Sequence, residues 1–240
     1  MPTATSTLTA AAAVQTVLPL KGSPPSSSSA APQINATAAT LRSLYTRAAR
    51  AFLNREIPLT HSLLTSAFSV LHQPASPAPD DLAIHRRKWD ILRITLETSL
   101  YASPPVAADL EALPAPLRAN FVLAPSALIT SLHSRSLNFF TPATHRPNPD
   151  AAFLPSQILL TLVLSSLKID CPEVGRAMIE GWLARRGRRE ESPEDEEGYK
   201  KVLETYCLHM LPRLGQWDYA KEYLRYETEL APDCREVRLR

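Results

Sequence analysis

Apolar residues recur at helical spacing along most of this chain, and proline-rich segments separate each such stretch from the next. Within the first stretch, Leu41, Tyr45 and Ala48 are three or four positions apart, which is the spacing of one helix face. The chain holds 22 prolines and only 6 glycines, which suits helix starts and rigid linkers better than tight turns. No useful length of alternating apolar and polar residues occurs, so no sheet is expected. The sequence therefore predicts an all-α protein.

The predicted helices should pair into antiparallel hairpins. They are expected at about 38–53, 59–71, 81–101, 125–140, 155–168, 172–186, 199–211 and 217–230, with a short turn at 108–113. The segment 155–168 is apolar nearly all round, so it is expected to be the most buried element. Residues 1–37 are largely Ala, Ser, Thr and Pro and are predicted to be a disordered tail. The predicted organisation is this tail followed by one helical, repeat-like domain at 38–240.

The last predicted hairpin carries the most informative motif. A turn glycine, an aromatic residue, a small residue, a leucine and a closing proline follow one another: Gly215, Trp217, Ala220, Leu224 and Pro232. This pattern resembles the second half of a tetratricopeptide repeat, a helical hairpin of roughly 34 residues. In such a repeat Gly215 permits the turn and Ala220 allows close helix approach, while Trp217 and Leu224 are expected to be buried. The pattern favours a degenerate tetratricopeptide-like (TPR-like) α-solenoid of stacked hairpins over a generic helical bundle.

Composition and motifs argue against nucleic-acid binding and catalysis. A net charge of +2 comes with no basic stripe interleaved with aromatic residues, as nucleic-acid binders have. The six histidines contain no pair at i and i+4, and the three cysteines contain no Cys-x-x-Cys motif. No phosphate loop or nucleophile elbow is present. We therefore expect no enzyme activity, no catalytic residue, no metal and no cofactor.

Protein binding is the function class that this leaves, and one basic cluster is the best candidate contact. Residues 85–88 are His-Arg-Arg-Lys, and Arg93 follows one and a half turns later. Such a run is usually a solvated helix face, and it also suits an acidic partner. The predicted contact residues are Arg86, Arg87 and Arg93. The three tryptophans are expected to be core anchors, with a partner-facing tryptophan as the alternative: Trp89, Trp182 and Trp217.

Four segments carry a resemblance to a known family: 45–53 (YTRAARAFL), 60–64 (THSLL), 85–98 (HRRKWDILRITLET) and 167–172 (LKIDCP). They resemble the membrane-anchor peroxin of filamentous fungi (peroxin-26-like), which tethers the peroxisomal AAA ATPases. The resemblance covers about 41–230 and rests on general sequence character, not on a catalytic motif. It implies a helical domain on the cytosolic face of the peroxisomal membrane. There the domain would recruit the ATPase pair that recycles the matrix-protein import receptor.

One departure from that family concerns the membrane anchor. Its members are tail-anchored, whereas the strongest apolar run here, 158–167, is about half of the ~20 residues that a span requires. Membrane attachment is therefore expected only through a segment absent from this chain. Two alternatives stay open: a TPR-like adaptor in vesicle or tail-anchored-protein trafficking, and a helical hydrolase or transferase with an unrecognised site. A deep apolar pocket with convergent polar groups would favour the enzyme, and an open ridged surface the adaptor.

Overall fold

The computed structural model describes residues 30–78, 80–145, 147–185 and 193–226. Within these ranges all regular structure is helical and no strand occurs, which confirms the all-α prediction. The longer helices are α1 (Ala30–Leu53), α2 (Ile57–Val70), α3 (Ala83–Ala102), α6 (Pro125–Phe140), α7 (Ser156–Lys168), α8 (Pro172–Leu183), α9 (Pro193–Thr205) and α11 (Trp217–Tyr226). The shorter ones are α4 (Ala107–Glu111), α5 (Ala115–Asn120) and α10 (Leu211–Arg213), with a π turn at Tyr206–Met210 between α9 and α10.

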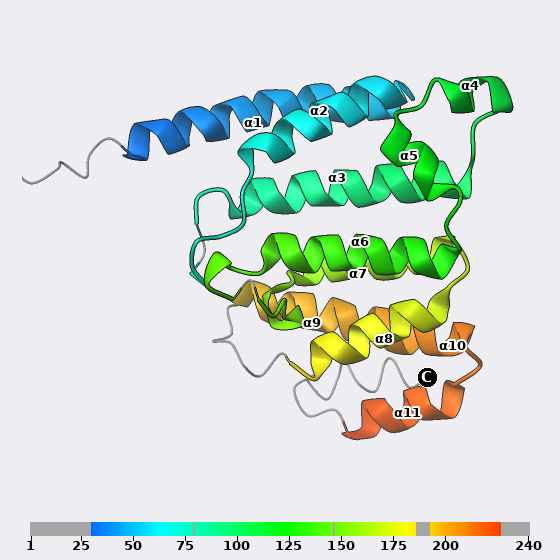
Figure 1. The fold of residues 1–240 in the computed structure, drawn as a ribbon. Helices are drawn as coiled ribbons and strands as arrows, with labels where there is room; N and C mark the ends of the chain where they lie inside the picture. The colour runs from blue at the N-terminus through cyan, green and yellow to red at the C-terminus, as the bar shows by residue number, and fades with distance from the viewer. Residues whose placement is uncertain (1–29, 79, 146, 186–192, 227–240) are drawn as a thin grey trace, which may run out of the picture.

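The long helices stack in successive layers (Figure 1). Helices α1, α3, α7 and α9 contact one another in that succession and run in the same direction. Helices α2, α6, α8 and α11 run back in the opposite direction, with α2 packed beside α1 and α8 beside α7. Helix α7 contacts α3, α6, α8 and α9. It is therefore the central element of the stack.

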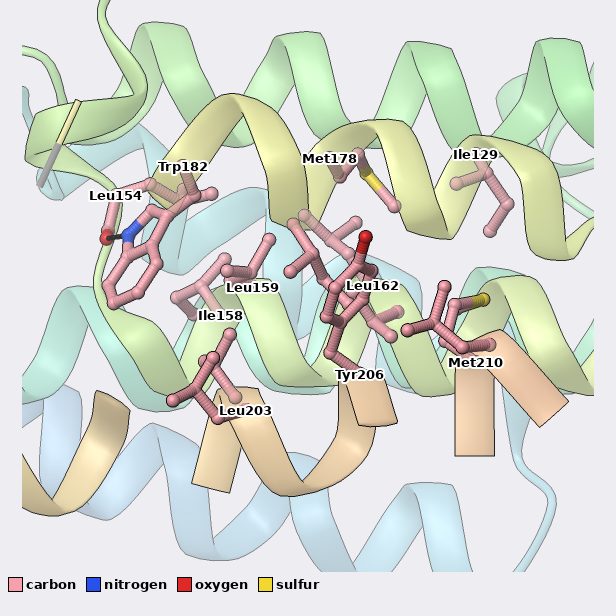
Figure 2. Packing of buried hydrophobic residues seen from close by; sticks show 14 of the residues in the cluster. Ile129, Leu154, Ile158, Leu159, Leu162, Met178, Trp182, Leu203, Tyr206 and Met210 are labelled. Atoms are coloured by element: carbon pink, nitrogen blue, oxygen red, sulfur yellow. Dashed lines mark hydrogen bonds between the residues drawn. The ribbon is translucent and has the colours of Figure 1, made fainter. Parts of the chain in front are cut away.

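Two apolar clusters meet at α3. The smaller one joins α1, α2, α3 and α5, with Leu41, Leu64, Trp89, Leu96 and Leu117 among its members. The larger one joins α6 to α11 and takes in Ile94 of α3. Figure 2 shows part of it, where Ile158, Leu159 and Leu162 of α7 pack among residues of α8 and of the last hairpin. Trp89 and Trp182 are both buried, as expected, and Trp182 Nε1 donates to the Leu154 carbonyl at 3.0 Å.

Prolines and small residues fix the helix starts and the close contacts. Pro125 and Pro172 are the first residues of α6 and α8, where the missing amide hydrogen has no partner to lose. The π turn immediately precedes α10, whose second residue, Pro212, cannot donate to the preceding turn of helix. In α8, a Cβ on Gly175 would overlap the side chain of Ser166 in α7. Only glycine therefore allows these two helices to approach so closely.

The structure corrects several predicted boundaries. Helix α1 begins at Ala30, so residues 30–37 are helical where a disordered tail was predicted, and 1–29 lie outside the described residues. Alanine has the highest helix propensity, and three of these eight residues are alanine, which favours extension of the helix. Helix α5 occupies a stretch expected to be a proline-broken loop, because Pro116 is accommodated in its first turn. Helix α9 begins at Pro193, within a segment predicted to be a charged loop or frayed end.

Candidate functional site

An open groove of about 430 Å³ lies where the N-terminal ends of α3, α7 and α9 come together. It is lined by Ile84, Arg87, Lys88 and Ile91 of α3, by Pro155, Ser156, Gln157 and Leu160 at the start of α7, and by Glu197, Gly198 and Lys201 of α9. These three helices are neighbours in the stack although their sequences are far apart. The groove therefore exists because the order in which the helices stack brings these three together.

The floor of the groove is apolar. Ile84 is 55% exposed, and Ile91 and Leu160 are half-buried. One turn beyond Leu160 on the same side of α7, Leu164 is 54% exposed. The prediction that α7 is the most buried element is therefore wrong on this side. Its all-round apolar sequence is covered on the faces that meet its neighbours and remains open here.

The α3 side of the groove is electropositive. Lys88 lies with its ammonium 6.0 Å from the centre of the Tyr45 ring, and Arg87 stands beside it. Burial lowers the pKa of the neighbouring His85, and the positive charges of Arg42 and Lys88 lower it further. On the opposite side, Lys201 forms an ion pair with Glu197 at 2.7 Å, so those two charges balance. Lys88 therefore gives the α3 side a positive charge that no described carboxylate pairs.

Gly198 sets how closely α9 approaches α7 at the bottom of the groove. A Cβ built on it would lie 2.7 Å from the Cβ of Ser156 at the start of α7. Any larger residue would push the two helix ends apart and widen the groove. This glycine was not recognised in the sequence, because glycine is needed here only to make room for Ser156, 42 positions earlier.

The three predicted contact arginines do not share one surface. Arg87 does line the groove. Arg86 is only 3% exposed: its Nε donates to the His72 carbonyl at 3.0 Å, and its guanidinium forms an ion pair with Asp80. It ties the loop before α3 to the end of α2. The prediction that Arg86 lies on a solvated docking face is therefore wrong.

Arg93 is also turned inward. Its guanidinium pairs with Asp90, donates to Ser136 Oγ at 3.3 Å, and stacks 5.0 Å from the ring centre of Phe68. Its side chain is 12% exposed. Successive helix residues turn by about 100°, so a run such as 85–88 points in all directions and cannot share one face. Arg93, seven residues after Arg86, returns to the buried side of that helix.

A buried ionic cluster between α3 and α6 was missed in the sequence. Asp90 is fully buried and accepts a hydrogen bond from Ser136 Oγ at 2.7 Å. Burial raises the pKa of Asp90, although the charge of Arg93 opposes that shift. One signal could have revealed the cluster: charged residues recur at spacings of four, three and four along one face of α3, at Arg86, Asp90, Arg93 and Glu97.

Glu97 extends this cluster toward α5 and α6. Arg135 binds both its carboxylate oxygens at 2.9 Å, and Asn120 donates to one of them at 2.8 Å. Each ionised group therefore has a partner, as buried charges require. The arrangement explains how the helices are held together. It does not present a group to a substrate.

The predicted repeat positions are met in part. Gly215 has a φ of 72°, and it forms the turn that leads into α11. Ala220 and Leu224 are 5% and 2% exposed, as expected. Trp217 is 60% exposed, so the prediction that it is a core anchor is wrong: it shares a face of α11 with Ala220 and Leu224, but it is the first residue of the helix, where that face is left exposed. Pro232 lies outside the described residues.

A second hollow of about 440 Å³ contains the residue types that an enzyme would use, with His145 and Asp150 in its wall. Asp150 is engaged structurally. Its carboxylate accepts from the Ala152 amide at 3.0 Å and lies 3.7 Å from Arg185. His145 packs against Phe153 with ring centres 5.1 Å apart. No nucleophile–base pair is formed by these contacts.

Among the described residues, no three side chains of the metal-binding types gather into a potential ion site. In the same part of the chain, every helix is too short or too polar to cross a bilayer. Cys171 and Cys207 are buried thiols, and burial raises the pKa of Cys171 to about 11.

No protein-family model, no curated protein and no solved structure matches this chain.

Proposed function

We propose that this protein is a protein-binding scaffold with the architecture of a degenerate TPR-like α-solenoid. The succession α1, α3, α7, α9 along one side, with antiparallel helices along the other, supports the solenoid. The observation that carries the binding function is the groove across α3, α7 and α9. Apolar side chains are left exposed there on a helix that is otherwise packed on several sides.

The proposed partner comes from the resemblance to the fungal membrane-anchor peroxin. In this proposal the chain recruits the peroxisomal AAA ATPase pair at the cytosolic face of the peroxisomal membrane. A long helical stack suits such a large ring, because it offers an extended surface without needing a deep pocket.

Two alternatives lead to different experiments. A TPR-like adaptor in vesicle or tail-anchored-protein trafficking would use the same groove for another partner. A helical enzyme would need a reactive group, and the hollow beside His145 is the nearest candidate. The contacts that engage Asp150 in capping and ion pairing make that second alternative weaker.

The test is a pull-down from peroxisome-containing extract, with the purified protein as bait and with ATP present or absent. Enrichment of both AAA ATPases over a bait-free control is the expected result. If neither ATPase is enriched in either nucleotide condition, the proposed partner is wrong. The adaptor function would then be the one to pursue.

A further inference from the structure

The groove across α3, α7 and α9 combines a hydrophobic floor with an excess of positive charge on one side. We propose that its occupant is a single amphipathic helix of a partner protein, with acidic residues along the edge that faces α3. This inference rests on the proposed protein-binding function and specifies the chemistry of the partner segment. It does not depend on which protein supplies that segment.

The apolar residues form two rows, one on each of two neighbouring helices that run in the same direction. Ile84 and Ile91 are two turns apart on α3, or about 10 Å along the axis. Leu160 and Leu164 are one turn apart on α7, or about 6 Å. A helix laid between two such rows buries an apolar stripe at i, i+3, i+4 and i+7. An extended peptide would offer alternate side chains to opposite faces and fill only one row.

The charges around the groove favour a partner segment that is negatively charged. Lys88 is exposed, and among the described residues no carboxylate forms an ion pair with it. Burial is the main cause of the lowered pKa of His85, and the positive charges of Arg42 and Lys88 lower it further. Glu197 is the one carboxylate among the described residues that line the groove, and it is already paired with Lys201. An acidic edge on the incoming helix would therefore be attracted, and a basic edge repelled.

A peptide selection tests the occupant directly. The full chain is used as bait for a displayed library of random peptides of about 16 residues, enough for four turns of helix. We expect the selected peptides to carry Leu, Ile or Met at i, i+3, i+4 and i+7, with Asp or Glu beside these apolar positions. Their affinity should fall as salt is raised. The proposal would be overturned if the selected peptides were basic, if their apolar residues lacked helical spacing, or if no common sequence pattern emerged.

Surface variants locate the binding site. Ile84→Glu and Lys88→Glu should each weaken the best acidic peptide by about tenfold or more. The matched controls are Val122→Glu, an 88% exposed apolar residue beyond the other end of α3, and Lys221→Glu on α11; both should leave binding unchanged. Equal binding by all four variants, at an unchanged melting temperature, would show that the peptide binds elsewhere. Lys88-dependent binding to phosphatidylserine-rich vesicles without acidic-peptide binding would assign the groove to a membrane surface instead.

The same variants separate this inference from the proposed partner. If the ATPases are enriched by the wild-type bait and by the Ile84→Glu bait alike, the recruitment proposal stands and the groove is not its site. If acidic peptides bind in the groove and no ATPase is enriched, the occupant's chemistry stands and the partner assignment fails.

Discussion

The two sides of α3 reverse the usual distribution of polarity. The side facing α6 and the α2 end buries three charged residues, Arg86, Asp90 and Glu97, and covers most of the side chain of Arg93. The opposite side leaves Ile84 more than half exposed and Ile91 half-buried in the groove. The comparison teaches that residue polarity alone does not tell which side of a helix faces inward. Charged side chains are tolerated inside a protein where each one is paired, and the exposed side chain of Ile84 is consistent with the proposed docking of a partner.

The two sides also differ in what they contribute to folding. A buried ion pair adds little net stability compared with well-packed apolar residues. Removing one partner is nevertheless destabilising, because it leaves the other charge buried without a counter-ion. An exposed isoleucine contributes almost nothing to the folded state. We therefore expect changes on the inner side to act on stability and changes on the outer side to act on binding.

The largest effect is expected for Asp90→Ala. It leaves the buried Arg93 without its counter-ion, which should lower the free energy of unfolding by about 3–5 kcal/mol in urea denaturation. The double variant Asp90→Leu/Arg93→Leu should recover most of that loss, because neither charge is left unpaired. A loss below about 1 kcal/mol for the single variant would mean that α3 does not bury this charge.

Two isoleucines of α3 provide a matched test of its sides. Ile94 is fully buried and Ile84 is 55% exposed. Ile94→Ala should cost about 2–5 kcal/mol, because it removes packed methyl groups and leaves a cavity. Ile84→Ala should change stability by less than about 0.5 kcal/mol. Similar losses for the two variants in the same denaturation experiment would contradict the orientation of the helix.

Two charge reversals, at positions two residues apart on α3, test the same difference between its inner and outer sides. Arg86→Glu places a carboxylate against Asp80 and the His72 carbonyl, and should cost about 1–3 kcal/mol through the unmet buried contacts. Lys88→Glu lies in the open groove and should stay within about 0.5 kcal/mol. Thermal melts of the two variants give the comparison. If Lys88→Glu were the more damaging change, the assignment of the two sides would be reversed.

The smallest effect is expected at His85, which sits between the two sides. Its pKa lies below the usual 6.5 because of burial and then because of Arg42 and Lys88. Lys88→Glu replaces a repelling charge with an attracting one, so it should raise the pKa of His85 in an NMR titration. Lys221→Glu, on α11, should leave it unchanged.

The sign of the stability effect follows from this shift. Because folding lowers the pKa of His85, its contribution to stability is complete above pH 6.5 and is lost as the pH falls through the lowered value. In Lys88→Glu the loss on acidification should be smaller than in the wild type. An equal or larger loss would show that Lys88 does not act on this imidazole.

Local sequence was enough to predict the helical character and several helix limits. Apolar spacing at three and four positions specifies helices without reference to the rest of the chain. Proline at the first position of α6 and α8, and Gly215 with its positive φ, act through their own backbone preferences. For the same reason the burial of Trp89 and Trp182 was predicted, since each lies on the apolar side of its own helix.

Tertiary structure decided which side of each helix was covered. Arg86 and Arg93 became interior residues because His72, Asp80 and Ser136, from other segments, supply their partners. Trp217 became a surface residue because it is the first residue of α11, where the face that it shares with Ala220 and Leu224 is not covered by other described residues. The groove exists only where the N-terminal ends of α3, α7 and α9 come together, although these helices are dozens of residues apart in the sequence. Such non-local coverage depends on the order in which helices stack, and helical periodicity within one segment contains no information about it.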